Sequence, residues 1–422
     1  MSIQEVMIKE GIKLHKIETN KFKTNLIAVF LTTPLTRENV TKDALITAIL
    51  RRGSKNLPSQ NEISKKLEEM YGGEFDCGIE KTGDNHVIKF YLETLNDEFL
   101  PEKEELLKKS MNILFDIIFN PYVENEGFKE EYFQGEKENL KQLIEGKIDN
   151  KATYALDKCI EHMYQNEAYG LYKYGYVEDL EKMSAKDLYQ YYQDLISKCK
   201  IDIFISGQIG NEVEEITRGN EMIKQLKQRN PEYIQDSRKE KKEKDKIDEI
   251  KESMKIAQGK LVIGLDILNY DNQAKYVALM YNAILGGTAN SKLFQNVREK
   301  ASLAYTAASS YVRQKNNIFI RCGIEIPNYQ KAVDIIKKQL EDMKKGDFTQ
   351  EELENTRTYI LSTIKGIEEE QDTEITYYLG QELSGYKMSI EEYENKIKEV
   401  TKEKIIEIAK QIKINTIYFL KD

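Results

Sequence analysis

The sequence predicts an α+β protein made of two tandem, homologous halves, each with an antiparallel-rich sheet packed by long helices. Apolar, β-branched segments alternate with long amphipathic ones, the order of these segments is repeated, and a charged segment lies between the repeats. A chain of 422 residues also exceeds the size at which a single hydrophobic core stops growing. We therefore expect an N-terminal half at 1–227, a linker at 228–252 and a C-terminal half at 253–422.

The first half opens with an apolar, β-branched run at 25–35, NLIAVFLTTPL, which predicts a strand. The stretch DALITAILRRGS follows at 43–54 and predicts a helix that Thr41 or Asp43 caps and that ends before Gly53. The other elements expected here are helices at 59–73, near 100–118, at 125–147 and at 150–164, and strands at 86–95 and 201–209.

Residues 228–252, QRNPEYIQDSRKEKKEKDKIDEIKE, are almost entirely polar and carry charges of both signs. Such a composition favours a solvated linker, or the exposed face of a helix, over a binding tail.

The second half repeats the order of the first. Ala48-Ile49-Leu50 and Ala283-Ile284-Leu285 are each followed by a glycine and then by a helix, although the shared order of elements is a stronger sign of a repeat than this short match. The elements expected here are strands at 260–267, 304–312, 318–326 and 415–422, and helices at 276–287, 290–301 and in the region between the last two strands.

The totals exclude several classes of protein. A net charge of −9 argues against nucleic acid as a partner, because binding phosphates requires a surplus of Lys and Arg. No apolar stretch approaches the roughly 20 residues that span a bilayer, so we expect no membrane insertion. Residues 1–23 carry charges throughout and lack the apolar core of a signal peptide, which favours a cytoplasmic protein.

Cysteine and histidine are scarce. The four cysteines have no CxxC spacing, so each is expected to be reduced and buried. The three histidines are too few for most zinc hydrolase sites and most Ser/His or Cys/His triads. These residues are Cys77, Cys159, Cys199 and Cys322, and His15, His86 and His162.

One segment imitates a metal motif. KCIEHMYQ at 158–165 contains Glu161 and His162 but has Lys158 at the first ligand position, and an ammonium group repels a metal ion. His15 and His86 have no neighbouring ligand in the sequence. We therefore expect no metal ion at any of the three histidines.

Residues 286–311, GGTANSKLFQNVREKASLAYTAASSY, carry the most distinctive pattern in the chain. The segment resembles the C-terminal half of the insulinase-like (pitrilysin, M16) metallopeptidases, in which a Gly pair, Ser-x-Leu-Phe and Arg-Glu-Lys-x-x-Leu-Ala-Tyr recur. The tandem halves agree with this family, so the resemblance covers essentially the whole chain. It implies a fold of two halves that form a clam-shell.

Active members of that family carry His-x-x-Glu-His on a helix of the first half and a third zinc ligand, a Glu, on a later helix. Two imidazoles four residues apart share one helix face and hold zinc, and the Glu between them acts as general base. By this resemblance Ala44, Thr47 and Ala48 occupy the motif, Leu143 occupies the distal Glu position and Glu136 matches an acidic residue that alone holds no metal. The resemblance thus implies a chain without catalytic residues, metal ion or other cofactor.

Arg298 and Tyr305 have the spacing of an Arg and a Tyr that hold substrate near the scissile carbonyl in active members. The resemblance implies that they bind substrate here as well. The alternative is structural: Arg298 pairs with Glu299 or another acid, and Tyr305 packs at the start of a strand. The sequence leaves the two readings open.

The leading hypothesis is a catalytically inactive, bacterial M16 subunit that pairs with a zinc-bearing paralogue as a heterodimer around a peptide or extended polypeptide. In it Arg298 anchors the substrate and Tyr305 donates a hydrogen bond to the developing oxyanion. Among bacterial groups the chain looks most like the inactive partner associated with 5-aminopentanol modification of elongation factor P. A homodimer is also compatible with the sequence. The competing readings are a structural or peptide-binding scaffold, like the core subunits of the respiratory bc₁ complex, and, last, an independent peptidase with an unrecognised site.

Overall fold

A computed structural model gives the structure of residues 3–227, 230–268, 271 and 274–422. The chain forms two compact units, and each unit combines segments from distant parts of the sequence. The first contains Met1–Glu145, Leu171–Gln235 and Glu368–Tyr386, and the second contains Gly146–Gly170, Asp236–Ile367 and Lys387–Asp422.

These units differ from the contiguous halves 1–227 and 253–422 by the exchange of one helix in each direction. Helix α5 (Lys151–Met163) comes from the first half of the sequence but belongs to the second unit. Helix α13 (Gln371–Ser384) comes from the second half but belongs to the first unit. The exchange concerns packing, and the boundaries of the sequence repeat stay a prediction.

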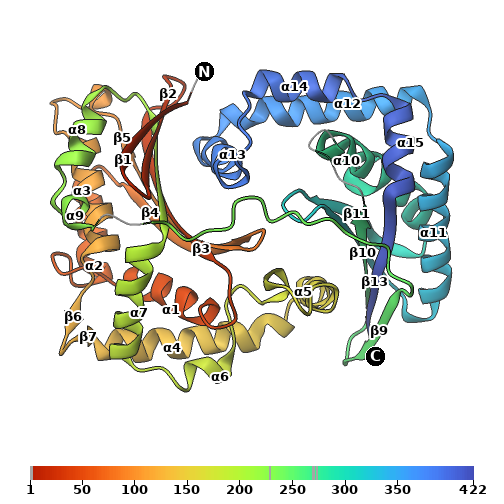
Figure 1. The fold of residues 1–422 in the computed structure, drawn as a ribbon, viewed down its shortest axis with the longest axis horizontal. Coiled ribbons are helices and arrows are strands. Elements are labelled where there is room, and N and C mark those ends of the chain that lie inside the picture. Colours follow the sequence, from red (N-terminus) through yellow and green to blue (C-terminus); the bar gives the residue numbers. More distant parts are fainter. Residues whose placement is uncertain (1–2, 228–229, 269–270, 272–273) are drawn as a thin grey trace. The chain divides into compact units, whose positions relative to one another are not determined.

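The first unit is built on a six-stranded sheet (Figure 1). Neighbouring strands in this sheet are antiparallel, except that the second and third strands in spatial order run parallel to each other. In spatial order the strands are β1 (Gln4–Lys9), β2 (Ile12–Glu18), β8 (Lys200–Gly207), β3 (Thr24–Pro34), β5 (Asn85–Leu95) and β4 (Glu74–Thr82).

One face of this sheet is covered by helices of the first half. Alternate strand residues such as Ile27, Val29 and Leu31 on β3 point into this core, as the period of two in a strand requires. The helices of this unit, α13 apart, are α1 (Val40–Leu50), α2 (Gln60–Glu69), α3 (Leu106–Phe119), α4 (Glu130–Glu145), α6 (Val177–Leu180), α7 (Ala185–Lys198), α8 (Glu212–Gly219) and α9 (Glu221–Gln225), with a small ribbon of β6 (Val123–Glu124) and β7 (Gly127–Phe128).

The other face is covered by α13, which lies on the opposite side of the sheet from α3, α8 and α9 (Figure 1). Ile375 and Leu379 of α13 pack in one buried cluster with Phe30 and Phe204 of the sheet. Gln371 at the start of the helix donates from Nε2 to the carbonyl oxygen of Ser206 over 2.9 Å. The sheet therefore carries buried apolar side chains on both faces.

The second unit contains a five-stranded sheet that is antiparallel except for its last pair. In spatial order its strands are β11 (Ala304–Val312), β12 (Asn317–Ile324), β10 (Gly259–Ile267), β13 (Ile412–Lys421) and β9 (Asp248–Ser253). Its helices besides α5 are α10 (Ala274–Asn282), α11 (Tyr329–Lys345), α12 (Gln350–Lys365), α14 (Ile390–Lys398) and α15 (Lys402–Gln411).

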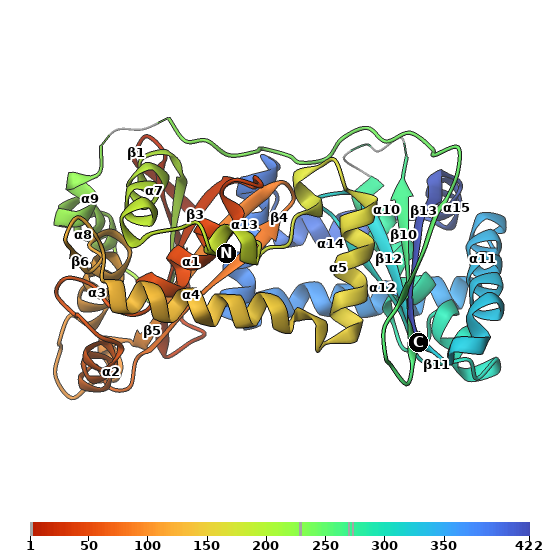
Figure 2. The same ribbon diagram turned by 90° about the horizontal axis from the view of Figure 1, so that it is seen from below.

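Helix α5 lies along one face of this sheet and α11 lies on the other side (Figures 1 and 2). Cys159 and Met163 of α5 pack in a buried cluster with Val262, Phe319 and Tyr418 of the sheet. The second sheet, like the first, has one face covered by a helix from the other half of the sequence.

Most described residues of the charged segment at 228–252 are exposed, as its composition predicts, but the segment is also bonded to its surroundings. Residues 228 and 229 lie outside the described residues, but the rest of the segment makes defined contacts. The amide of Glu232 donates to the carbonyl oxygen of Lys198 over 2.9 Å, and Lys241 donates to Asp266 over 2.6 Å. Its last residues, Asp248–Glu252, belong to strand β9. Hydrogen bonds to both units, together with the pairing of β9, therefore hold parts of a segment that is largely exposed to solvent.

Most expected elements are present, with shifted ends. The cap of α1 was predicted wrongly: Asn39 precedes the helix, and the side chains of Thr41 and Asp43 bond to other elements. The helix expected at 276–287 ends in a π-helical segment, Ala283–Gly287. Within the described residues, none of the helices combines the length and apolar character needed to cross a bilayer.

Two glycine substitutions are expected to have opposite effects on stability. Gly53 has φ +154°, and a side-chain carbon there would lie 2.6 Å from the carbonyl oxygen of Leu57. Gly53→Ala should lower the free energy of unfolding by about 2–4 kcal/mol. Gly380→Ala inside α13, where an added side-chain carbon would meet no atom within 4 Å apart from the helix's own backbone, should raise it by roughly 0.5–1 kcal/mol. Urea denaturation of both variants measures these changes, and equal effects would contradict the expectation.

Candidate functional site

Helix α1 carries the residues that stand at the positions of the family's metal motif. Their side chains pack inside the first unit. Ala44 and Thr47 are each 5% exposed, and the Thr47 hydroxyl donates to the carbonyl oxygen of Asp43 over 2.8 Å. Ala48 is partly buried. Methyl groups and a hydroxyl bonded to its own helix offer no ligand set for zinc. The apolar positions between them, Leu45, Ile46, Ile49 and Leu50, lie in the core of the first unit.

The later helix of the motif, α4, offers no ligand at the expected position either. Leu143 stands there, and it is 44% exposed. Glu136, the acidic residue earlier on the same helix, accepts a hydrogen bond from the Arg52 guanidinium. Because Arg52 neutralises this carboxylate, the pair ties α4 to the end of α1.

The turn after α1 is also held by internal bonds. The Ser54 hydroxyl bonds to the buried carboxyl group of Asp116 and accepts from the amide of Leu57 over 3.0 Å. Asn56 donates to the other oxygen of Asp116 over 2.7 Å. The Arg52-Gly53-Ser54 turn thus has a structural role that its sequence alone does not reveal.

Sequence reasoning missed a buried network that begins on α1. Asp43 accepts from His86 Nδ1 over 2.9 Å and from the Tyr191 hydroxyl over 2.7 Å, and the side chains of Asp43 and His86 are fully buried. The other ring nitrogen of His86 lies 2.9 Å from the carbonyl oxygen of Lys173, to which it can only donate. A proton is therefore also needed between Nδ1 and the carboxylate.

This network is structural rather than catalytic. Burial, together with the neighbouring Asp43 carboxylate, raises the pKa of Tyr191, so its hydroxyl stays protonated and donates. Asp43 and His86 are buried and therefore closed to a substrate, and the hydroxyl of the partly buried Tyr191 is bonded to Asp43. The network joins α1, β5 and α7. A signal for it in the sequence would have been a single acid and a single histidine that both precede apolar runs.

Arg298 lies on the π-helical segment η5 (Phe294–Lys300) of the second unit. Its guanidinium group stands 4.5 Å from the ring centre of Phe294, and its Nε lies 3.8 Å from a carboxylate oxygen of Glu299. The side chain remains 44% exposed. The contact with Glu299 that the structural reading expects is thus present but long, and such an exposed pair contributes little stability.

Tyr305 is the second residue of the edge strand β11 and is 71% exposed. This exposure does not fit the reading in which the ring packs at the start of the strand. Two side chains at the ends of a short connection, Arg298 and Tyr305, are therefore both open to solvent. Their role in binding stays a prediction.

The metal-like segment on α5 makes ordinary contacts. Lys158 pairs with Glu161 over 2.9 Å, and the ring of His162 lies 6.1 Å from that of Tyr418. Cys159 is fully buried, and burial raises the pKa of its thiol to about 12. The thiolate that a metal would need is therefore strongly disfavoured here.

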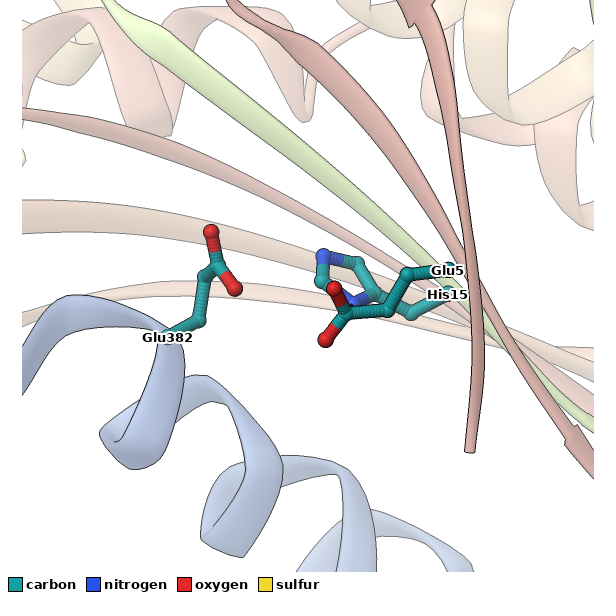
Figure 3. A group of neighbouring side chains, drawn as sticks. All are labelled: Glu5, His15 and Glu382. Atoms are coloured by element: carbon teal, nitrogen blue, oxygen red, sulfur yellow. The ribbon is translucent and has the colours of Figure 1, made fainter. Parts of the chain in front are cut away.

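A second feature missed from the sequence is a group of ligand-type side chains on the first unit. Glu5, His15 and Glu382 present ligand atoms that all lie within 4.8 Å of one another (Figure 3). Across the described ranges, no other cluster of His, Cys, Asp or Glu satisfies the same spacing. Glu382 is 367 residues from His15 in the sequence, so only the exchange of α13 brings them together.

Comparison with known proteins identifies the class of protein that has this fold and, in helix α1, no metal ligands at the motif positions. Residues 182–360 match the family model described as the Peptidase M16 inactive domain. A curated relative is 33% identical over 415 residues, which covers 97% of this chain and 96% of the relative. The chain belongs to the M16 peptidase family, and it is a non-catalytic member.

That relative is the probable inactive metalloprotease YmfF of Bacillus subtilis (strain 168). A second curated relative from the same organism, the uncharacterized zinc protease YmxG, is 23% identical over 364 residues, 84% of this chain and 80% of the relative. The predicted family resemblance and the predicted lack of catalytic activity are thereby confirmed.

Solved structures confirm the predicted α+β fold. A conserved protein from Enterococcus faecalis V583 is 28% identical, with a TM-score of 0.91 and coverage of 100% of this chain and 99% of that one. A peptidase M16 inactive domain from Pseudomonas fluorescens is 17% identical, with a TM-score of 0.79 and coverage of 100% and 98%. At that identity the second likeness concerns the fold alone.

His86 is expected to support stability through its bond to Asp43 and, in addition, through its bond to the carbonyl oxygen of Lys173. His86→Leu should lower the free energy of unfolding by about 3–5 kcal/mol, because it leaves the buried Asp43 carboxylate with the Tyr191 hydroxyl but without its histidine partner. The double variant Asp43→Leu/His86→Leu should cost less than the sum of the single changes, with a coupling of about 1–3 kcal/mol. Urea denaturation of the two single variants and the double variant measures this, and strictly additive losses would refute a direct pair.

Proposed function

We propose that this chain is the non-catalytic subunit of a peptide-processing pair, in which a zinc-bearing M16 paralogue performs the hydrolysis. The observation that carries the proposal is a contrast between two segments. Helix α1 keeps its packing but has no ligands at the motif positions, whereas Arg298 and Tyr305 remain exposed on the second unit. A subunit that binds substrate beside a partner's zinc site needs the exposed Arg298 and Tyr305 but needs no metal ligands on α1.

Each exposed side chain has a defined task in this proposal. The Arg298 guanidinium, whose contact with Glu299 is long, is available to bind a substrate carboxylate or backbone carbonyl. The Tyr305 hydroxyl would donate a hydrogen bond to the oxyanion that develops on the peptide at the partner's site. The chemistry thus belongs to the partner, and this chain contributes binding and electrostatic stabilisation.

The partner is expected to have the same fold with the metal motif intact. YmxG supports this choice, since a protein named as a zinc protease aligns with 84% of this chain. We propose that the pair works in the cytoplasm. A scaffold that binds peptides without aiding hydrolysis, including a homodimer of this chain, is the competing outcome of the same experiments.

Co-expression with the M16 paralogue of the same genome that carries His-x-x-Glu-His tests the pairing. A stable heterodimer should form on size-exclusion chromatography, and the peptidase activity of the paralogue should rise when this chain is added. Equal activity of the paralogue alone would reject the proposal in favour of a scaffold.

The two exposed residues are expected to affect different kinetic constants in the reconstituted pair. Tyr305→Phe should lower kcat by about 10²-fold, because it removes a donor to the oxyanion. Arg298→Ala should mainly raise KM, because it removes a contact made in the ground state. Tyr359→Phe, another exposed tyrosine of the second unit, and Lys300→Ala, on the same π-helical segment as Arg298, are the matched controls. Peptide hydrolysis assays measure all four, and unchanged constants for Tyr305→Phe and Arg298→Ala would leave both residues structural.

We further propose that the pathway is the 5-aminopentanol modification of elongation factor P, to whose inactive partner protein the sequence looks most similar. Deleting the gene in its host should leave elongation factor P without the added group. Intact-mass analysis of the purified factor checks this, with a strain complemented by the wild-type gene as control. An unaltered mass in the deletion strain would exclude the pathway while leaving the proposed pairing untouched.

A further inference from the structure

The group formed by Glu5, His15 and Glu382 results from strand register and from the docking of α13. Glu5 on β1 lies directly opposite His15 on β2, and His15 in turn lies opposite Phe204 on β8. Glu382 reaches the same place from the last turn of α13. All four residues belong to the first unit.

His15 is held in one orientation. Its Nε2 lies 2.9 Å from a carboxylate oxygen of Asp202, and its ring stacks on Phe204 with 4.1 Å between the centroids and 6° between the planes. The Lys200 ammonium group bonds to the same Asp202 carboxylate. A carboxylate oxygen in this position accepts the Nε2 hydrogen, which leaves the lone pair of a neutral ring on Nδ1.

The other nitrogen, Nδ1, is the unusual atom. His15 is 1% exposed, and Nδ1 has no hydrogen-bond partner among the described residues. A buried acceptor without a partner costs free energy, so its position needs a physical reason. Nδ1 lies 3.9 Å from a carboxylate oxygen of Glu5, and the two carboxylates and the ring point toward a common space (Figure 3).

We propose that Glu5, His15 and Glu382 form a binding site for a divalent transition metal, for which Zn²⁺ is the best match. One imidazole nitrogen and two carboxylates are a zinc ligand set, and an orienting carboxylate on the second ring nitrogen is the usual arrangement for a histidine ligand. The site is separate from α1, and it does not depend on the proposed function.

Two lysines hold the carboxylates when no metal is bound. The Lys13 Nζ lies 2.7 Å from a carboxylate oxygen of Glu382 and 3.5 Å from one of Glu5. The Lys200 Nζ lies 3.2 Å from a carboxylate oxygen of Glu382. The carboxylates of Glu5, Glu382 and Asp202 face the ammonium groups of Lys13 and Lys200. The net charge of these five groups is −1. If a divalent ion displaces the partly exposed Lys13 side chain, the remaining charges sum to zero.

The geometry requires only a small adjustment. Ligand atoms around a tetrahedral zinc ion lie about 3.4 Å apart, so a group within 4.8 Å must contract by on the order of 1 Å. Glu5 lies on the edge strand β1 and its side chain is 24% exposed, so its carboxylate can move. Bound zinc would then join α13 to strands β1 and β2.

Calorimetric titration of the metal-free full chain with ZnCl₂ near neutral pH tests the site. Wild type should bind one equivalent of zinc, and its thermal unfolding midpoint should rise with zinc concentration. His15→Gln should raise the Kd by about 100-fold or more, and Glu5→Gln, on an edge strand where folding is least at risk, should raise it by about 10-fold or more. Lys13→Met should lower the Kd by about 10-fold, because it removes the competing ammonium group.

Lys16→Met and Glu18→Gln are the matched controls, since both residues lie on β2 outside the group. Their Kd values should equal that of wild type. The proposal is overturned if wild type binds no zinc, or if Glu5→Gln and His15→Gln bind it as tightly as wild type does. A Lys13→Met variant with weaker binding would also overturn it, because the ammonium would then be part of the site rather than its competitor.

Discussion

The whole structure depends on one constraint: each sheet has two apolar faces, and the helices of its own half of the sequence cover only one. In the first unit Phe30 and Phe204 point away from the main core and are buried by α13. In the second, Val262 and Phe319 are buried by α5. Burial contributes about 1.5–3 kcal/mol for each large apolar side chain, so the free-energy cost of leaving either face bare would be comparable to the whole stability of an ordinary domain.

This exchange of helices explains where the two polar features of the first unit lie. The His86 network sits in the main core, between elements of a single half, and is closed to solvent. The His15 group sits on the face that α13 covers, where a residue from the other half completes it. Both features place charge next to apolar surface, which is tolerated only where every carboxylate has a partner.

The fold class, most of the central strands and the absence of metal ligands from helix α1 could be predicted from the sequence. Period and composition carry that information, as in β3, whose apolar run is buried on both faces. Strand β2 was missed because Lys13, His15 and Lys16 interrupt its apolar pattern, and these polar side chains are accommodated by partners distant in sequence.

Some residues of the candidate site could likewise be predicted from the sequence, and others could not. Ala44, Thr47, Ala48 and Leu143 could be assigned by resemblance, since a motif is local in sequence. The partners of Asp43, Glu136 and His15 could not, because they depend on tertiary contacts across 43 to 367 residues. Exposure of Tyr305 was equally out of reach, because an aromatic residue at a strand start is compatible with either state.

The exchange of α13 also has a consequence for how the protein is made. Translation supplies the six strands of the first sheet by residue 207, but the helix that closes their second face ends at Ser384. At the usual pace of about 5–20 residues per second, an apolar surface containing Phe30 and Phe204 stays open on the nascent chain for roughly ten seconds or more. The first unit can therefore complete its folding only after residue 384 has been synthesised, and until then its exposed apolar face favours binding by chaperones.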